Sequence, residues 1–104
     1  MDIREITEGD FEHEVIDSRE PVVVDFSAEW CGPCQMMGQK IANELVPQMP
    51  ELKVVKVNVD EAPELAAAFN VMSIPALFCY KGGRHVAEFV GVTDVAEIQL
   101  AFRK

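Results

Sequence analysis

The chain has 104 residues, of which 49% are hydrophobic and 26% charged, and its formal net charge is −9 at pH 7. This length and composition predict one folded domain spanning residues 1–104 and exclude a disordered or fibrous protein. The excess of acids disfavours nucleic-acid and membrane partners, and the sequence has neither an apolar run long enough to span a bilayer nor a basic and apolar leader, so we expect a soluble protein.

Strand and helix patterns alternate from the first residues onward. Residues 3–6 predict a short edge strand, and Thr7 or Asp10 can cap the helix that follows. The side chains expected to share one face of this helix are Phe11, Val15 and Ile16. Residues 22–27, VVVDFS, are β-branched and almost continuously apolar, which predicts a strand buried on both faces at the centre of the sheet.

A long helix is predicted to begin where Cys31 ends the next loop, and Gly38 is a position at which it can bend. The residues that recur at four-residue spacing along its buried side are Met37, Ile41 and Leu45. Residues 52–59 predict a second strand, and Pro63 suits the first position of a short helix that runs to about Phe69.

The last third of the chain predicts a hairpin and a helix. Residues 76–80 and 85–90 are two strand patterns joined by the turn sequence KGGR. Asp94 and Glu97 have capping-box spacing before a helix whose apolar face contains Val95, Ile98 and Phe102. Strands that alternate with helices and end in a hairpin and helix predict an α/β domain with helices on both faces of a mixed sheet.

Cys31 and Cys34 lie three positions apart in the sequence EWCGPCQMM. As a structural disulfide they would close so small a loop that it contributes only about 2 kcal/mol. As zinc ligands they would need two more, and the chain offers only Cys79, His13 and His85, none in a second paired spacing. Both readings stay open but weak, as does a metal shared between two chains.

A redox role gains support from the position of the two sulfurs. Cys31 precedes a helix, whose free N–H groups and positive dipole end favour a thiolate, and Cys34 lies one turn deeper. Lowering a thiol pKa from about 8.5 to about 7 raises its thiolate fraction at pH 7 from roughly 3% to roughly 50%, although nucleophilicity falls in parallel. The sequence therefore predicts Cys31 as the nucleophile and Cys34 as a hindered second sulfur.

The segments VVVDFSAEWCGPC and KVNVDEAPELAAAFNVMSIPALFCYKGG, with a later Gly91, resemble the thioredoxin family over nearly the whole chain. The resemblance implies the thioredoxin fold, in which a central mixed sheet of about five strands is flanked by four helices. It also implies a small dithiol electron carrier that reduces protein disulfides. The redox group would be a Cys31–Cys34 disulfide, with no bound cofactor and no metal.

The family motif assigns the attack on substrate to Cys31 and the resolution of the mixed disulfide to Cys34, while Gly32 and Pro33 accompany a reducing pair. The family takes electrons from NADPH through a flavoprotein, thioredoxin reductase, and this sequence has no dinucleotide-binding fingerprint of its own. We therefore expect a cytoplasmic monomer that is reduced by such a reductase. The alternative is a binding subunit or cochaperone that holds partners without turnover.

Other site residues follow from the same resemblance. Asp25 matches a buried carboxylate that takes a proton from Cys34, and burial is expected to raise its pKa. Lys56 matches a lysine that tunes this carboxylate. Pro75 matches a cis-proline, preceded by a residue whose backbone pairs with substrate. The residues expected to contact substrate are Trp30, Met72, Ile74, Pro75, Val90 and Gly91.

The sequence departs from the family pattern at several positions near this site. Ser27 stands where tryptophan is common, so the site is expected to be looser, and Gln39 replaces a proline that kinks the long helix. Met72 and Ser73 replace a polar or basic residue and a glycine, which makes the substrate rim more apolar. Cys79 lies outside the motif, and its strand pattern predicts a buried, unreactive side chain.

Overall fold

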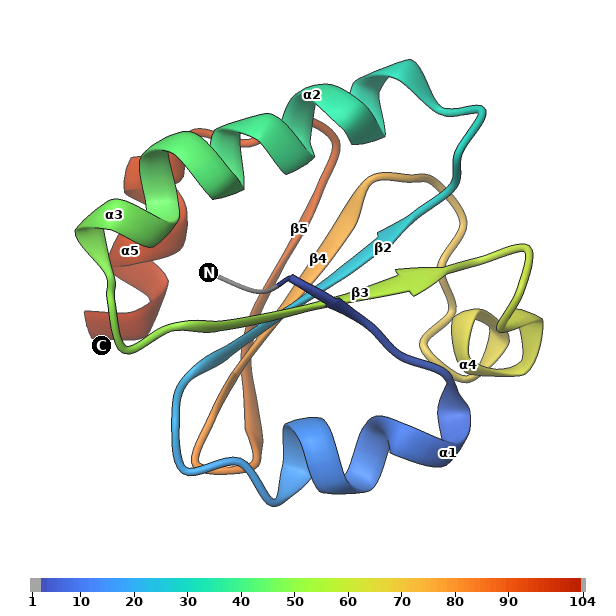
Figure 1. Ribbon diagram of the computed structural model, residues 1–104, viewed down its shortest axis with the longest axis horizontal. Coiled ribbons are helices and arrows are strands. Elements are labelled where there is room, and N and C mark those ends of the chain that lie inside the picture. The colour runs from blue at the N-terminus through green and yellow to red at the C-terminus, as the bar shows by residue number, and fades with distance from the viewer. Residues whose placement is uncertain (1–2, 104) are drawn as a thin grey trace.

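The computed structural model describes residues 3–103, which form a five-stranded sheet with the order β1-β3-β2-β4-β5 (Figure 1). The strands are β1 (Arg4–Glu5), β2 (Val22–Ser27), β3 (Lys53–Asn58), β4 (Ala76–Lys81) and β5 (Arg84–Val90). The first three are parallel, β4 is antiparallel to β2, and β5 is antiparallel to β4. The predicted mixed sheet and its central strand are confirmed.

Four helical regions cover the sheet, two on each face (Figure 1). They are α1 (Glu8–Phe11) with the π-helical η1 (Glu12–Ile16); α2 (Gly32–Lys40) continued by the π-helical η2 (Ile41–Leu45) and α3 (Val46–Gln48); α4 (Pro63–Ala68); and α5 (Val95–Arg103). Helices α2 and α5 lie over one face, and α1 and α4 lie over the other. Within the described residues, no helix combines the length and apolarity needed to cross a membrane.

Every residue of β2 is buried, because β3 and β4 flank the strand and helices cover both of its faces. Since side chains alternate along a strand, Val22, Val24 and Phe26 face the α1 and α4 side, whereas Val23 packs under α2 and α5. Asp25 points to the same side as Val23. The alternation therefore places one carboxylate beneath α2.

The two faces carry separate apolar cores. Beneath α2 and η2, the side chains of Met37, Ile41 and Leu45 are fully buried, as their spacing predicts. The opposite core contains a cluster of aromatic rings with centroids 4.9 to 6.5 Å apart: Phe11, Phe26, Phe69, Phe78 and Tyr80. Close packing on both faces gives the loops at the end of the sheet a rigid support.

Two local predictions differ from the structure. Ile16 is 39% exposed, although its spacing suggested the buried face shared by Phe11 and Val15. It lies in the π-helical η1, where each residue turns through a smaller angle than in an α-helix, so the apolar face drifts. The long helix leaves α-geometry at Ile41 rather than at Gly38.

One end of the sheet brings together four segments that are distant in sequence. Ser27 pairs with Asn58 where β2 and β3 end, and Ala76 pairs with both Phe26 and Val90 where β4 begins and β5 ends. The loops that leave or enter the sheet at these residues therefore meet. Cys31 and Pro75, 44 positions apart, belong to two of these loops.

Candidate active site

Cys31 and Cys34 form a disulfide at the N-terminus of α2, with their Cα atoms 5.2 Å apart. Cys31 is the residue that caps the helix, Gly32 and Pro33 are exposed in its first turn, and Cys34 follows them. Among residues 3–103, no group of three or more His, Cys, Asp or Glu side chains is arranged to hold a metal ion. The sulfurs of Cys31 and Cys34 are bonded to each other.

The start of α2 places positive partial charge beside the Cys31 sulfur. The N–H of Cys34 donates a hydrogen bond to Cys31 Sγ at 3.1 Å, and the sulfur occupies the place that a capping oxygen takes at other helix starts. The helix dipole adds to this hydrogen bond. When the disulfide is reduced, this arrangement can stabilise a thiolate on Cys31.

The two cysteines are equally exposed in the disulfide form. Each residue is 4% exposed, and the apolar side chains packed around the pair include Ala28, Val59 and Ile74. The expectation that Cys34 is the more hindered sulfur concerns the reduced pair and stays a prediction, because the exposed fractions in the disulfide form do not differ. The bond ties both sulfurs into one small apolar cluster, so any difference in access must come from the reduced pair or from the direction of attack.

Asp25 lies under the first turns of α2 and is only 3% exposed. Its Oδ1 has no hydrogen-bond partner within residues 3–103. Burial raises the pKa of Asp25 to about 6, and the positive charge of Lys56 acts in the opposite direction. A carboxyl group with this pKa can exchange protons near neutral pH.

Lys56 is directly opposite Asp25 in the pairing of β2 with β3, so both side chains leave the same face of the sheet. Lys56 is exposed, which leaves its ammonium group solvated. The alternation of apolar residues could not assign this face from the sequence. The pairing register of β2 with β3 places the Lys56 side chain on the same face as Asp25.

A pocket of about 580 Å³ connects this carboxylate with the second cysteine and with solvent. Its lining includes Asp25, Lys56, Cys34, Gln35 and Gln39. None of the substrate-contact residues predicted from the sequence lines it. Solvent can therefore reach Asp25 and Cys34 without passing through the rim.

The predicted substrate contacts include three highly exposed apolar side chains. Trp30 is 72% exposed, Met72 90% and Val90 64%. Trp30 and Met72 line one small pocket, and Met72 and Val90 line a second. Exposed apolar side chains gathered beside a reactive disulfide form a surface suited to binding another protein.

The backbone beside the disulfide comes from the loop before β4. The carbonyl oxygen of Ile74 lies 4.0 Å from Cys31 Sγ, and the Ile74–Pro75 peptide bond is cis, as the resemblance implies. The N–H of Gly91 donates to the Pro75 carbonyl at 2.8 Å, with Gly91 at φ +86°, a conformation that glycine adopts without strain. This hydrogen bond joins the loops that carry Ile74 and Gly91.

Asp60 is a residue of this site that the sequence analysis missed. Its Oδ2 accepts a hydrogen bond from the indole Nε1 of Trp30 at 2.8 Å. The Asp60 N–H in turn donates to the Asn58 side chain at 2.9 Å, which shapes the turn after β3. Because Trp30 and Asp60 are 30 positions apart, no local pattern links them.

Two departures from the family pattern have structural counterparts. Ser27 is 2% exposed and its hydroxyl has no hydrogen-bond partner within residues 3–103, so a small polar group lies near Asp25 on the same strand. Cys79 is fully buried and unpaired, and burial raises its pKa to about 12. Cys79 therefore behaves as a buried apolar side chain, as its strand pattern predicts.

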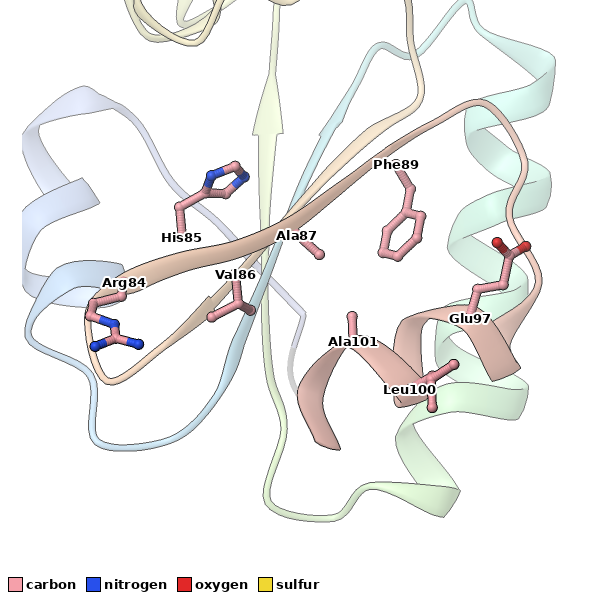
Figure 2. A pocket seen from close by; sticks show the side chains of 8 residues that line it. All are labelled: Arg84, His85, Val86, Ala87, Phe89, Glu97, Leu100 and Ala101. Atoms are coloured by element: carbon pink, nitrogen blue, oxygen red, sulfur yellow. The ribbon is translucent and has the colours of Figure 1, made fainter. Parts of the chain in front are cut away.

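A separate pocket of about 570 Å³ lies between β5 and α5 (Figure 2). Its lining includes His85, Ala87, Phe89, Glu97 and Leu100. None of the site residues predicted from the sequence lines it. This pocket is therefore separate from the site predicted around the disulfide.

A redox disulfide at a helix N-terminus, at one end of a five-stranded mixed sheet, defines the class of protein: a thiol–disulfide oxidoreductase. The Thioredoxin family model matches residues 2–104. Thioredoxin 1 of Nostoc sp. is 41% identical over 101 residues, covering 96% of this chain and 94% of that protein. The thioredoxin of Pyropia yezoensis is 35% identical over 104 residues, covering 100% and 97%.

Solved structures agree with these relatives. The solved structure of a thioredoxin from Plasmodium falciparum superposes with a TM-score of 0.82 and 33% identity, covering 97% of this chain and 98% of that one. The chain belongs to the thioredoxin family. It is a protein-disulfide reductase whose redox group is the Cys31–Cys34 disulfide itself.

Proposed function

We propose that the reduced protein transfers two electrons to target disulfides through a mixed disulfide on Cys31, which Cys34 resolves. The Cys31 thiolate attacks one sulfur of the target, the target S–S bond breaks, and the other target sulfur leaves as a thiolate that takes a proton from solvent. The hydrogen bond from the Cys34 N–H to Cys31 Sγ supports Cys31 as the nucleophile. This contact is the observation on which the proposal chiefly rests.

The second step returns the protein to the disulfide form. Cys34 loses its proton and attacks the Cys31 sulfur, so that the Cys31–Cys34 bond forms and the second target sulfur leaves as a thiolate. Both electrons have then passed to the target, and the step is intramolecular, which favours it over attack by an external thiol. The short loop of Gly32 and Pro33 keeps the two sulfurs within bonding distance.

Asp25 is the proposed acceptor of the Cys34 proton. It shares a pocket with Cys34, and its pKa of about 6 leaves it mostly ionised at pH 7. Lys56 lines the same pocket and would keep this pKa from rising further. Proton transfer can proceed directly or through solvent that enters the pocket.

The exposed rim is the proposed binding surface for the target. Trp30, Met72 and Val90 would contact it with apolar side chains, while the Ile74 backbone beside Pro75 would pair with an extended segment. Gly91 carries no side chain that could obstruct such a segment. The distance of 4.0 Å between the Ile74 carbonyl and Cys31 Sγ supports this placement.

A thioredoxin reductase is the proposed source of electrons, because the family motif, including Gly32 and Pro33, accompanies reducing pairs, with thioredoxin near −270 mV. Such a reductase takes its electrons from NADPH through a flavin. We place the protein in a reducing compartment such as the cytoplasm, where glutathione and thioredoxin systems keep thiols reduced.

Replacement of the resolving sulfur tests this proposal. Reduced Cys34→Ser protein, mixed with insulin, should accumulate a mixed disulfide linked through Cys31, because the second step is removed. Mass spectrometry of alkylated, digested adducts identifies the linked cysteine. The Cys31→Ser/Cys34→Ser protein is the control and should form none, even though Cys79 remains.

Two results would contradict the mechanism. Adducts linked through Cys79 would show that the buried thiol, not the helix-capping one, attacks the target. Insulin reduction by the Cys31→Ser/Cys34→Ser protein at the wild-type rate would show that the activity does not depend on the pair. Equilibration of the wild-type protein against glutathione buffers would separately place the couple on the reducing or the oxidising side.

A further inference from the structure

The charged residues on the four segments that form the rim beside the disulfide are all acidic. Four segments meet at this end of the sheet, residues 28–37, 58–64, 70–76 and 88–94, and together they contain no lysine, arginine or histidine. Their charged residues are Glu29, Asp60, Glu61, Glu64, Glu88 and Asp94. The opposite end of the sheet differs, because residues 17–21, 48–52 and 81–84 carry three acids and three bases.

Crowding of like charges is visible at Glu61. A side-chain hydrogen bond with Glu5 and repulsion from Glu5 and Asp60 raise the pKa of Glu61. Together with the lack of cations on the four segments, this crowding makes the rim more negative than the opposite end of the sheet, where acids and bases balance. Such a field attracts cations and repels anions over distances of about a Debye length.

Two small pockets share the exposed residue Met72 in their lining. One, of about 160 Å³, is lined mainly by apolar side chains that include Trp30, Val71 and Ile74. The other, of about 140 Å³, includes Val71, Val90 and Glu88. Each pocket is thus mainly apolar and has a carboxylate at its border, since Asp60 holds the Trp30 indole and Glu88 lines the second pocket.

Lysine and arginine have the shape and charge that such pockets fit. Their methylene stems cover apolar surface while the cationic head stays at a polar edge. An aspartate or glutamate at the same place in a target would face the carboxylate of Asp60 or of Glu88. The sign of its charge would therefore distinguish one target from the other, since the four segments carry no lysine, arginine or histidine that would compensate for an acidic target.

We infer that this protein acts preferentially on protein disulfides whose neighbouring residues are lysine or arginine. This inference rests on the proposed function, since it assumes that the rim around Met72 receives the target. Asp60 and Glu88 are the residues that set the preference. They act on binding and on the rate of encounter and take no part in the exchange of sulfur bonds.

Three synthetic peptides test this inference. Each carries the same intramolecular disulfide, and the residues that flank it are lysine, glutamine or glutamate. Reduced protein is mixed with each peptide at pH 8, and the reaction is quenched by alkylation. Each rate constant is divided by that for reduction of the same peptide by dithiothreitol, which corrects for intrinsic differences between the disulfides.

We expect the normalised rate to fall in the order lysine, glutamine, glutamate, with roughly tenfold between the extremes at 10 mM salt. In 1 M salt the Debye length shrinks to about 3 Å, so the gap should narrow to about twofold. For the Asp60→Asn/Glu88→Gln protein, the normalised rates with the lysine and glutamate peptides should differ by only about threefold at low salt. Asn at position 60 keeps an acceptor for the Trp30 indole, so packing of the ring is retained.

Glu51→Gln is the control for position, because it removes a negative charge at the opposite end of the sheet. It should leave the gap at its wild-type size. Equal normalised rates for the three peptides, or an equal loss of the gap in Glu51→Gln, would overturn the inference while the proposed function stands. Failure to reduce any peptide, the glutamine one included, would instead overturn the proposed function.

Discussion

Two carboxylates are buried within residues 3–103, and their surroundings are opposite. Glu14, 7% exposed on η1, lies 3.1 Å from Arg4 and 2.7 Å from Lys53, and its pKa is lowered, chiefly by the hydrogen bond with Lys53. Asp25, 3% exposed on β2, has an oxygen without a hydrogen-bond partner in the described chain, and burial raises its pKa. One acid is neutralised by two cations, whereas the other faces a single solvated lysine across a pocket.

This difference separates a structural acid from one available for chemistry. A carboxylate held by two cations is stable as an anion and gains little by taking a proton. A carboxylate that the fold destabilises as an anion accepts a proton readily, and its ionisation lowers the stability of the folded protein. Asp25 therefore has the properties of a general base beside Cys34, and Glu14 has those of a link between β1, η1 and β3.

The largest expected effect is kinetic and concerns Asp25 alone. The Asp25→Asn protein lacks the group that takes the Cys34 proton, so resolution of the mixed disulfide should slow by roughly 100-fold at pH 7. Rapid quenching by alkylation, followed by mass spectrometry, should detect a transient Cys31-linked adduct in Asp25→Asn that the wild-type protein does not accumulate. The wild-type resolution rate should rise as the pH passes through about 6.

Glu14→Gln supplies the comparison for this experiment, because it also removes a buried carboxylate. It should resolve the mixed disulfide at the wild-type rate. If Asp25→Asn and the wild-type protein had the same rates from pH 6 to 9, Asp25 would be a structural acid like Glu14, and the contrast between the two would be lost.

The next largest effect is on the stability of the fold at pH 8, which removal of the Asp25 carboxylate should raise and removal of the Glu14 carboxylate should lower. Because the pKa of Asp25 is raised from 3.8 to about 6, its contribution to stability is full below pH 4 and is lost as the pH rises through 6. A shift of this size corresponds to at most about 3 kcal/mol at pH 8. The oxidised Asp25→Asn protein should therefore unfold at higher denaturant concentration than the wild type at pH 8, with little difference at pH 3.5.

For Glu14 the signs are reversed. Its pKa is lowered, so its ion pairs stabilise the fold above pH 4.5 and this contribution is lost as the pH falls. Glu14→Gln should unfold at lower denaturant concentration than the wild type at pH 8, and the difference should shrink in acid. Denaturant titrations of Asp25→Asn and Glu14→Gln at pH 8 and pH 3.5 test both predictions. A loss of stability in Asp25→Asn at pH 8 would contradict its assignment as an unpaired buried anion.

How much of these two sites can be predicted from the sequence depends on how close in sequence the interacting residues are. The Cys31 and Cys34 pair is predictable, because two sulfurs and a helix start lie within one turn. Asp25 could be assigned only through the family resemblance, since an acid in an apolar strand gives no indication of its neighbours. The pairing of Glu14 with Arg4 and Lys53 joins three elements and has no signature in the sequence.

The other features that the sequence analysis left open or missed also depend on residues distant in sequence or on the geometry of a whole helix. The side chain of Lys56 could belong to either face until the register of β2 and β3 placed it opposite Asp25. The hydrogen bond between Trp30 and Asp60 spans two loops. Ile16 left the buried face because the helix changed its geometry, which periodicity at a fixed angle cannot anticipate.

The smallest expected effect tests the cation that faces Asp25. Lys56 lowers the pKa of Asp25, so Lys56→Gln should move the pH midpoint of mixed-disulfide resolution upward, by less than about one unit because the ammonium group is exposed to water. Lys53→Gln removes a cation from the same strand, three positions away, but next to Glu14. It should leave the midpoint unchanged while lowering stability at pH 8. An equal shift in both variants would mean that the midpoint reports the overall charge of the protein and not the pair of Asp25 and Lys56.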